Sequence, residues 1–262
     1  MTTPSVLSER DGPVGRVIFH NPARRNALSL TMWEATAGIV EDLAADPEIR
    51  VIVLSGSGEL AFAAGADISR FQEERHGVAA VEHYNRITER AFASLQQAGK
   101  PTIAMIHGYC IGGGLALAIS CDLRFCAPDA RFAIPAAKLG LGYGYAGVRR
   151  LVQLVGPAFA QEIFFTARQF DAEEARIMGL VNRVVDKHLL ADTVADTAAT
   201  IAANAPLTVA AVKQTVLEIL KDPEAREMHR CEAAIRACFD SEDYLEGRQA
   251  FLEKRPPVFR GR

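Results

Sequence analysis

The sequence has no uninterrupted apolar stretch long enough to span a bilayer. Its amino terminus lacks both the apolar core of a signal peptide and an arginine-rich presequence. It has no long run of charges of one sign, and the formal net charge of its 262 residues is −3. These absences argue against a membrane or a nucleic acid as the main partner. We therefore expect a soluble, cytoplasmic protein.

Cysteine is scarce and irregularly placed. The sequence contains five cysteines, an odd number, and no CxxC spacing, the pattern typical of metal and redox sites; they are Cys110, Cys121, Cys126, Cys231 and Cys238. Free thiols in a reducing compartment are the simplest explanation for such a set. The sequence therefore predicts neither disulfides nor a metal site.

Apolar residues are abundant enough for a sizeable core, since they make up 49% of a chain of this length. Short apolar, β-prone runs alternate with helical patterns up to about residue 156, and the remainder is almost wholly helical in pattern. We expect a hairpin at 6–9 and 15–19, strands at 50–54, 102–106 and 122–126, and helices at 29–43, 186–202, 207–220 and 222–238. This pattern predicts an α/β protein with a helical carboxyl-terminal part.

Three glycines stand between a predicted strand and a predicted helix. Residues 102–106 precede Gly112, Gly113 and Gly114, and the helix formers 115–119 follow. Glycine lets the backbone turn sharply and lets a ligand approach closely. The first N–H groups of a helix lack intrahelical partners, so this turn offers a site for negative charge without a basic side chain. A plain glycine-rich turn is the simpler interpretation if the triplet is taken alone.

A second loop, Phe62-Ala-Ala-Gly-Ala-Asp-Ile68, follows the apolar run 51–54 in the same way. Together the two loops resemble those of the crotonase (enoyl-CoA hydratase/isomerase) superfamily. The resemblance covers nearly the whole chain, because other stretches match in the family's order and spacing: 21–22, 26–28, 164–168, 172–175, 178–182 and 251–254.

The resemblance implies a fold and a partner. It implies a crotonase-like ββα spiral core at residues 1–200 that binds acyl-CoA. A helical region at 201–262 would cover the site and form a homotrimer or a dimer of trimers. The substrate would be an acyl-CoA thioester of the kind met in fatty acid metabolism. No separate cofactor is implied, because coenzyme A is part of the substrate.

The resemblance also implies site residues. The backbone N–H groups of Ala66 and Gly113 would form an oxyanion hole at the thioester oxygen, and Arg24 or Arg25 would touch phosphate. Phe251 and Lys254 would reach CoA, often across a subunit boundary. The CoA-binding residues implied are Arg24, Ala64, Gly65, Ala66, Asp67, Ile68, Gly113, Phe251 and Lys254.

The acid–base groups that the family uses are missing here. Hydratases of the superfamily use two glutamates, and the matching positions in this chain are Ala116 and Ala136. Some isomerases, dehalogenases and hydrolases use an aspartate eight residues further on, where this chain has Gly144. Alanine and glycine cannot transfer a proton. The segment 70–97, which we expect to be helical and to line the acyl pocket, is the other source of side chains.

Tyr143 is the remaining candidate near the thioester. The segment 139–147 resembles the loop of methylmalonyl-CoA decarboxylases, which carry a tyrosine at this place. Loss of CO₂ generates an enolate without a base, so decarboxylation needs an oxyanion hole, a group that orients the carboxylate and a proton donor afterwards. Tyr143 would orient the carboxylate by hydrogen bonding. The likeness is partial, because those enzymes keep a carboxylate after the triglycine and a histidine at the position of Ala66. A role as a wall of the acyl pocket fits Tyr143 equally well.

Three functions stay open at this point. The first is an enoyl-CoA hydratase/isomerase-like lyase or isomerase with an atypical acid–base set, whose catalytic residues would be Ala66, Gly113 and Tyr143. The second is a short-chain acyl-CoA decarboxylase that uses Tyr143. The third is a non-catalytic protein that binds CoA thioesters. His76 and His83 lie in the 70–97 segment, but a helical histidine is more often a surface or packing residue.

Overall fold

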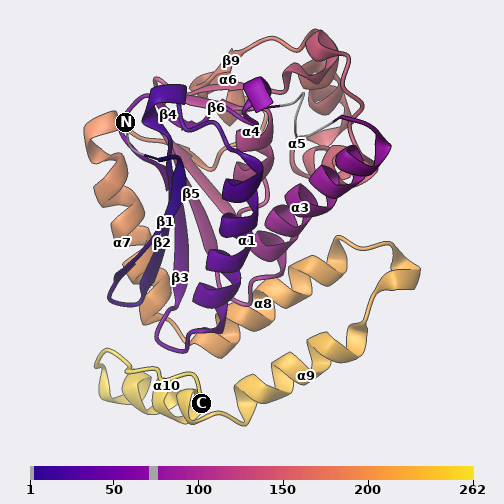
Figure 1. The fold of residues 1–262 in the computed structure, drawn as a ribbon. Coiled ribbons are helices and arrows are strands. Elements are labelled where there is room, and N and C mark those ends of the chain that lie inside the picture. The colour runs from indigo at the N-terminus through magenta and orange to yellow at the C-terminus, as the bar shows by residue number, and fades with distance from the viewer. Residues whose placement is uncertain (1–2, 71–75) are drawn as a thin grey trace.

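The computed structural model describes residues 3–70 and 76–262 (Figure 1). The strands form a six-stranded and a four-stranded sheet. The strand order of the larger sheet is β1 (Ser5–Asp11), β2 (Val14–His20), β3 (Val51–Gly56), β5 (Thr102–Ile106), β7 (Leu123–Cys126) and β10 (Arg183–Val184). Strands β1 and β2 pair antiparallel, and all other neighbours in this sheet are parallel.

The second sheet is made of the short strands that follow β3, β5 and β7 in the chain, together with a last strand near residue 170. Its order is β4 (Ala61–Ala63), β6 (Tyr109–Ile111), β8 (Arg131–Ala133) and β9 (Phe170–Asp171), and only the last pair is antiparallel. The consecutive pairs β3–β4, β5–β6 and β7–β8 are thus each divided between the two sheets. This arrangement confirms the predicted α/β class with its spiral of strand pairs.

Helices cover both faces of the larger sheet, with α1 (Leu30–Ala45) on one side and α7 (Leu190–Ala203) on the other (Figure 1). Side chains alternate along β3, because successive residues of a strand point to opposite faces. Ile52 and Leu54 belong to the main core with α1, whereas Val51 and Val53 pack with α7. The sheet therefore has a core on each face.

The remaining helices fall before and after α7 in the chain. Those before α7 are α3 (Val78–Gln97), α4 (Gly113–Ala118), α5 (Tyr145–Thr166) and α6 (Ala172–Ile177). Those after it are α8 (Pro206–Ile219), α9 (Met228–Phe239) and α10 (Glu242–Glu253), and α9 and α10 lie apart from both sheets (Figure 1). Within the described ranges, no helix combines the length and the apolar character needed to cross a membrane.

Several predicted elements differ in detail. The segment expected to be helical over 70–97 begins as α3 only at Val78, after the short 3-10 helix η2 (Ile68–Arg70), and residues 71–75 lie outside the described ranges. The part predicted to be almost wholly helical after residue 156 contains β9 and β10, which have two residues each, too few to show a strand period. The expected boundary between residues 200 and 201 falls inside α7.

Candidate functional site

The loop after β4 is held by a parallel bridge between Leu28 and Ala66. The N–H of Leu28 donates to the carbonyl of Gly65 at 2.8 Å, and the N–H of Asp67 donates to the carbonyl of Leu28 at 2.9 Å. In a parallel bridge, the residue between those two partners turns its own N–H to the other side. The N–H of Ala66 therefore faces away from Leu28.

At each position of the triplet, the structure shows a different reason why glycine is favoured. Gly112 has a φ of 54°, which favours glycine, and precedes α4. A Cβ on Gly113 would lie 2.8 Å from the Trp33 ring, and one on Gly114 would lie 2.2 Å from the carbonyl oxygen of Ala63. The triplet thus lets the start of α4 pack directly against Trp33 and the end of β4.

This close packing brings the two predicted N–H donors together. A Cβ on Gly113 would lie 3.8 Å from the nitrogen of Ala66, and one on Gly65 would lie 3.3 Å from the nitrogen of Gly113. Within the described ranges, no backbone hydrogen bond uses the N–H of Ala66 or of Gly113. Two neighbouring donors are therefore available at one place.

Ala66 and Gly113 both line a cavity of about 190 Å³. Its walls come from the loop after β4, from α3, α4 and α5, and from the 3-10 helix η3 (Pro135–Leu139). Of the residues predicted for the site, those that line this cavity are Ala64, Gly65, Ala66, Ile68, Gly113 and Tyr143. The sequence therefore identified a set that the fold brings together.

The positions without the expected carboxylates also line the cavity. Ala116 on α4 and Ala136 in η3 are both buried there, and Gly144 precedes α5. Among the described lining residues, the one carboxylate is that of Glu89 on α3. Sequence reasoning named the 70–97 segment as a source of side chains but did not identify this residue. Neither His76 nor His83 is among the described lining residues.

Tyr143 is fixed in the wall of the cavity. Its ring centroid lies 4.8 Å from that of Phe164, and a Cβ on Gly147 would lie 2.6 Å from the Tyr143 ring. Burial raises the pKa of Tyr143 to about 12, although the charge of Arg150 opposes the shift. The hydroxyl is therefore neutral at physiological pH and can donate a hydrogen bond.

Arg150 on α5 places a cation beside the same cavity, with 9% of its surface exposed. Its Nη2 donates to Oε1 of Gln96 at 2.9 Å, and its guanidinium carbon lies 5.4 Å from the centroid of the Phe92 ring. Its Nε and Nη1 are buried without a hydrogen-bond acceptor in the described part of the chain. Burial lowers the pKa of Arg150, and the charge of Glu89 opposes this effect. An arginine nevertheless stays charged in proteins.

The two arginines predicted to touch phosphate have partners within the chain. Nη1 of Arg24 donates to both carboxylate oxygens of Asp67, at 2.7 and 2.8 Å, and also to Ser69. Burial raises the pKa of Asp67, but the hydrogen bonds from Ser69 and Arg24 outweigh it and lower the pKa. The guanidinium carbon of Arg25 lies 4.4 Å from the centroid of the Tyr109 ring. A phosphate contact of either arginine stays a prediction.

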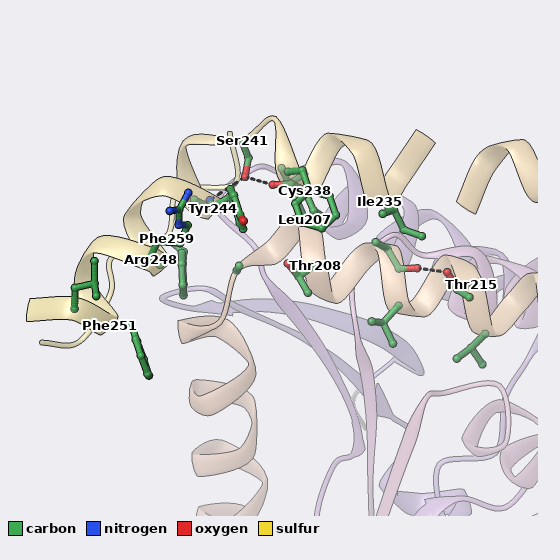
Figure 2. Close-up of a pocket in the computed structure, with 18 residues that line it drawn as sticks. Leu207, Thr208, Thr215, Ile235, Cys238, Ser241, Tyr244, Arg248, Phe251 and Phe259 are labelled. Carbon is green, nitrogen blue, oxygen red and sulfur yellow. Dashed lines mark hydrogen bonds between the residues drawn. The ribbon is translucent and has the colours of Figure 1, made fainter. Parts of the chain in front are cut away.

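Phe251 and Lys254 lie elsewhere in the chain. Phe251 is on α10 with 83% of its surface exposed, and Lys254 follows the last residue of that helix. Phe251 lines a second, mostly apolar cavity of about 890 Å³ between α8, α9 and α10 (Figure 2). In Figure 1, α10 and α4 lie at opposite ends of the molecule. A single chain therefore does not bring these two residues to Ala66 and Gly113.

Known proteins and a family model match nearly the whole chain in sequence. A family model described as enoyl-CoA hydratase/isomerase matches residues 9–262. The short-chain-enoyl-CoA hydratase of Clostridium acetobutylicum is 34% identical over 251 residues, which are 96% of this chain and 95% of the relative. The carnitinyl-CoA dehydratase of Citrobacter koseri is 35% identical over 258 residues, 97% of each chain.

Solved structures give the same result for the fold. The crystal structure of an enoyl-CoA hydratase/carnithine racemase from Magnetospirillum magneticum superposes with a TM-score of 0.93 at 36% identity. The match covers 100% of this chain and 97% of the other. The likeness therefore includes both loops that meet at the small cavity as well as the carboxyl-terminal helices.

Proposed function

Because the chain belongs to the enoyl-CoA hydratase/isomerase family, we propose that it acts on an acyl-CoA thioester whose enolate oxygen is held by the N–H groups of Ala66 and Gly113. The reaction is of the hydratase/isomerase type, with an acid–base set that differs from the usual pair of glutamates. CoA enters the site as part of the substrate.

The observation that carries this proposal is that Ala66 and Gly113 line one cavity and that their neighbouring N–H groups make no backbone hydrogen bond among the described residues. Two donors aimed at a thioester oxygen stabilise the negative charge that develops when an enolate forms. In other enzymes one such donor contributes about 3 kcal/mol of transition-state stabilisation. The donors belong to the backbone, so they persist although the side chains at 116 and 136 are alanines.

The size of the cavity favours a short acyl group. Its volume of about 190 Å³ is below the range of about 300–1,000 Å³ that sites for drug-sized ligands occupy. The pantetheine and nucleotide of CoA would lie outside this cavity, along residues 64–68.

A panel of acyl-CoA thioesters, with products identified by mass, tests the proposal. Trp33 is the single tryptophan of the chain and lines the cavity, so its fluorescence reports acyl-CoA binding independently of turnover. We expect turnover of at least one thioester, and loss of that turnover in Gly113→Pro, which deletes one N–H. Thermal unfolding of the variant checks that it folds. If the parent binds thioesters but turns none over, the chain is a non-catalytic CoA-thioester-binding protein and the proposal is wrong.

Hydration of crotonyl-CoA is a sharper test of the acid–base set. Losing a positioned acid or base costs about 100- to 10,000-fold in rate. We therefore expect this chain to hydrate crotonyl-CoA about 100- to 10,000-fold more slowly than a relative that has both glutamates. Full hydratase activity in a clean preparation would contradict the proposal that its acid–base set is unusual.

A second candidate is a short-chain acyl-CoA decarboxylase. Two features favour it: the neutral hydroxyl of Tyr143 in the cavity wall, and the buried Nε and Nη1 of Arg150, which have no hydrogen-bond acceptor among the described residues. A carboxylate on the acyl group would give the guanidinium a charged partner, and loss of CO₂ would form the enolate without a base. Release of CO₂ from malonyl-CoA or methylmalonyl-CoA would establish this activity. No release from either thioester would eliminate it.

We also propose that the chain assembles as a trimer or a dimer of trimers, in which Phe251 and Lys254 reach the CoA of a neighbouring subunit. Large apolar side chains that α9 and α10 expose in the single chain support this assembly; they include Ile235, Phe239, Leu245, Phe251 and Leu252. A cytoplasmic location remains part of the proposal.

A further inference from the structure

The cavity beside Ala66 and Gly113 contains one carboxylate among its described lining residues, that of Glu89. From its position we infer that Glu89, supplied by α3, is the proton-transferring group of this site and replaces the carboxylates absent at Ala116 and Ala136. This inference rests on the proposed function, because it assigns the base for the enolate whose oxygen the two N–H groups hold.

The other titratable groups of the cavity are poor proton acceptors. Tyr84 comes from α3, Tyr143 from the segment before α5, and Arg150 from α5 itself. A phenol and a guanidinium both keep their protons at neutral pH, and a carboxylic acid has already lost its own. Burial raises the pKa of Tyr143 to about 12, which makes its deprotonation still less favourable. Among the described residues of the cavity, Glu89 alone carries a group suited to accept a proton.

A series of contacts connects the face of α3 that carries Glu89 to the start of α4. Asn85, Thr88, Glu89 and Phe92 all line the cavity, and their spacing of three and four residues defines one face of a helix. The Phe92 and Trp33 rings pack edge to face at 5.6 Å. The Trp33 ring in turn occupies the space into which a Cβ on Gly113 would project.

This chain of contacts ties α3 to the start of α4. Glu89 precedes Phe92 by one turn, or about 4.5 Å along the helix axis at 1.5 Å per residue. Glu89 therefore lies on the same face of α3 as Phe92, which contacts Trp33, and Trp33 contacts Gly113.

The carboxylate of Glu89 also has no bonding partner among the described residues. Within the described ranges, no side-chain hydrogen bond and no ion pair engages it, whereas other acidic residues of the same region, such as Glu41, are paired. Its charge counteracts the effect of burial on the pKa of Arg150, another residue that lines the cavity. The side chain is exposed, which lets its proton exchange with bulk water.

The proposed step balances without a co-reactant. The Cα–H bond of the acyl group breaks, and its proton moves to a carboxylate oxygen of Glu89. The electron pair of that bond forms the carbon–carbon double bond of the enolate, and the carbonyl π pair moves to the oxygen held by Ala66 and Gly113. In D₂O, the carboxyl proton of Glu89 exchanges for a deuteron. When the step runs in reverse, Glu89 delivers this deuteron to Cα, and the thioester is recovered with deuterium at Cα.

Exchange of the α-hydrogens of butyryl-CoA in D₂O, followed by mass and by NMR, tests this step directly. We expect the parent to incorporate deuterium and Glu89→Gln to do so about 100- to 10,000-fold more slowly. Glu89→Asp keeps the carboxylate and should recover part of the rate. Glu82→Gln makes the same change on the same helix two turns earlier, outside the described lining of the cavity, and should match the parent.

The outcomes separate this inference from the proposed function. If the parent exchanges deuterium and Glu89→Gln exchanges equally fast, Glu89 is not the base, while the oxyanion site stands. If the parent neither exchanges deuterium nor turns over any thioester of the panel, both fail. Trp33 fluorescence and thermal unfolding should be alike in the parent and Glu89→Gln, because Glu89 is exposed and makes no described hydrogen bond. A variant that loses binding or folding would overturn a purely catalytic role.

Discussion

Tyr143 presents a neutral hydroxyl from a ring that Phe164 and Gly147 hold in place. Tyr143→Phe removes that hydroxyl at nearly constant volume. If the hydroxyl orients or protonates the acyl group, turnover should fall about 100-fold or more, and affinity for CoA should stay nearly the same, because the CoA moiety would lie along other residues. Steady-state rates and Trp33 fluorescence measure the two quantities. Unchanged turnover would mean that Tyr143 is only a wall of the cavity.

The same residue predicts a dependence of stability on alkaline pH. Its pKa is raised from the ordinary value near 10 to about 12 in the folded chain. The protonated hydroxyl thus favours the folded state fully below about pH 10, and this contribution is lost as the pH rises through about 12. Two pKa units correspond to at most about 2.7 kcal/mol.

Urea unfolding of the parent and of Tyr143→Phe between neutral pH and pH 11 checks this expectation. The parent should lose stability relative to the variant over the alkaline part of that range. Cys121 and Cys126 also have pKa values raised by burial, to about 12, but both proteins contain them, so their contribution cancels in the comparison. Parallel stability curves would contradict the predicted shift of Tyr143.

At the scale of elements, the junction of β4 and α4 depends on the absence of a side chain at Gly114. A Cβ there would lie 2.2 Å from the carbonyl oxygen of Ala63, which is backbone and cannot turn aside. Gly114→Ala should therefore destabilise the fold by about 1–3 kcal/mol, as other overpacked sites do. Thermal or urea unfolding gives the value.

Gly38→Ala is the matched control for that substitution. Gly38 lies inside α1, has no heavy atom within 4 Å of an added Cβ, and has no left-handed backbone conformation. Alanine there should stabilise the chain by about 0.5–1 kcal/mol, because glycine loses more entropy in a helix. If both variants lose stability alike, close packing at Gly114 is not the cause.

At the scale of the whole molecule, the helices after α7 expose several large apolar side chains, among them Phe239, Phe251 and Leu252, and a large contiguous apolar patch on a protein marks an interaction site. The mostly apolar cavity between α8, α9 and α10 lies within this region (Figure 2). We expect light scattering to give three or six times the chain mass of 28.4 kDa. A monomer at micromolar concentration would contradict the proposed assembly.

Lys254 tests whether that assembly completes the CoA site. As a point charge near phosphate it would contribute a screened interaction. Lys254→Ala should then weaken CoA binding more at low ionic strength than at high ionic strength, whereas Lys254→Arg should retain affinity. Equal binding of the parent and Lys254→Ala at low salt would remove Lys254 from the site.

Interactions between residues close in sequence determine many of the helices and strands of this chain. Strand β5 matches the predicted range 102–106, and Ser29 precedes α1 and accepts a hydrogen bond from Met32 N, as the sequence indicated. Caps and short strands depend on neighbouring residues, so their signals are present in the sequence. The resemblance of two glycine-containing loops to a family, and not local physics, predicted Ala66 and Gly113 as backbone donors, and their role stays a prediction.

Long-range packing decided the rest of the site. Arg24 and Asp67 are 43 residues apart, and their ion pair depends on the bridge between two loops. Glu82 and Glu89 share one face of α3, two turns apart, and helical periodicity treats them alike. Only the contacts of Phe92 with Trp33, and of Trp33 with the start of α4, bring Glu89 to the cavity and leave Glu82 outside its described lining. A side chain acquires its function from neighbours that are distant in sequence, and periodicity carries no information about them.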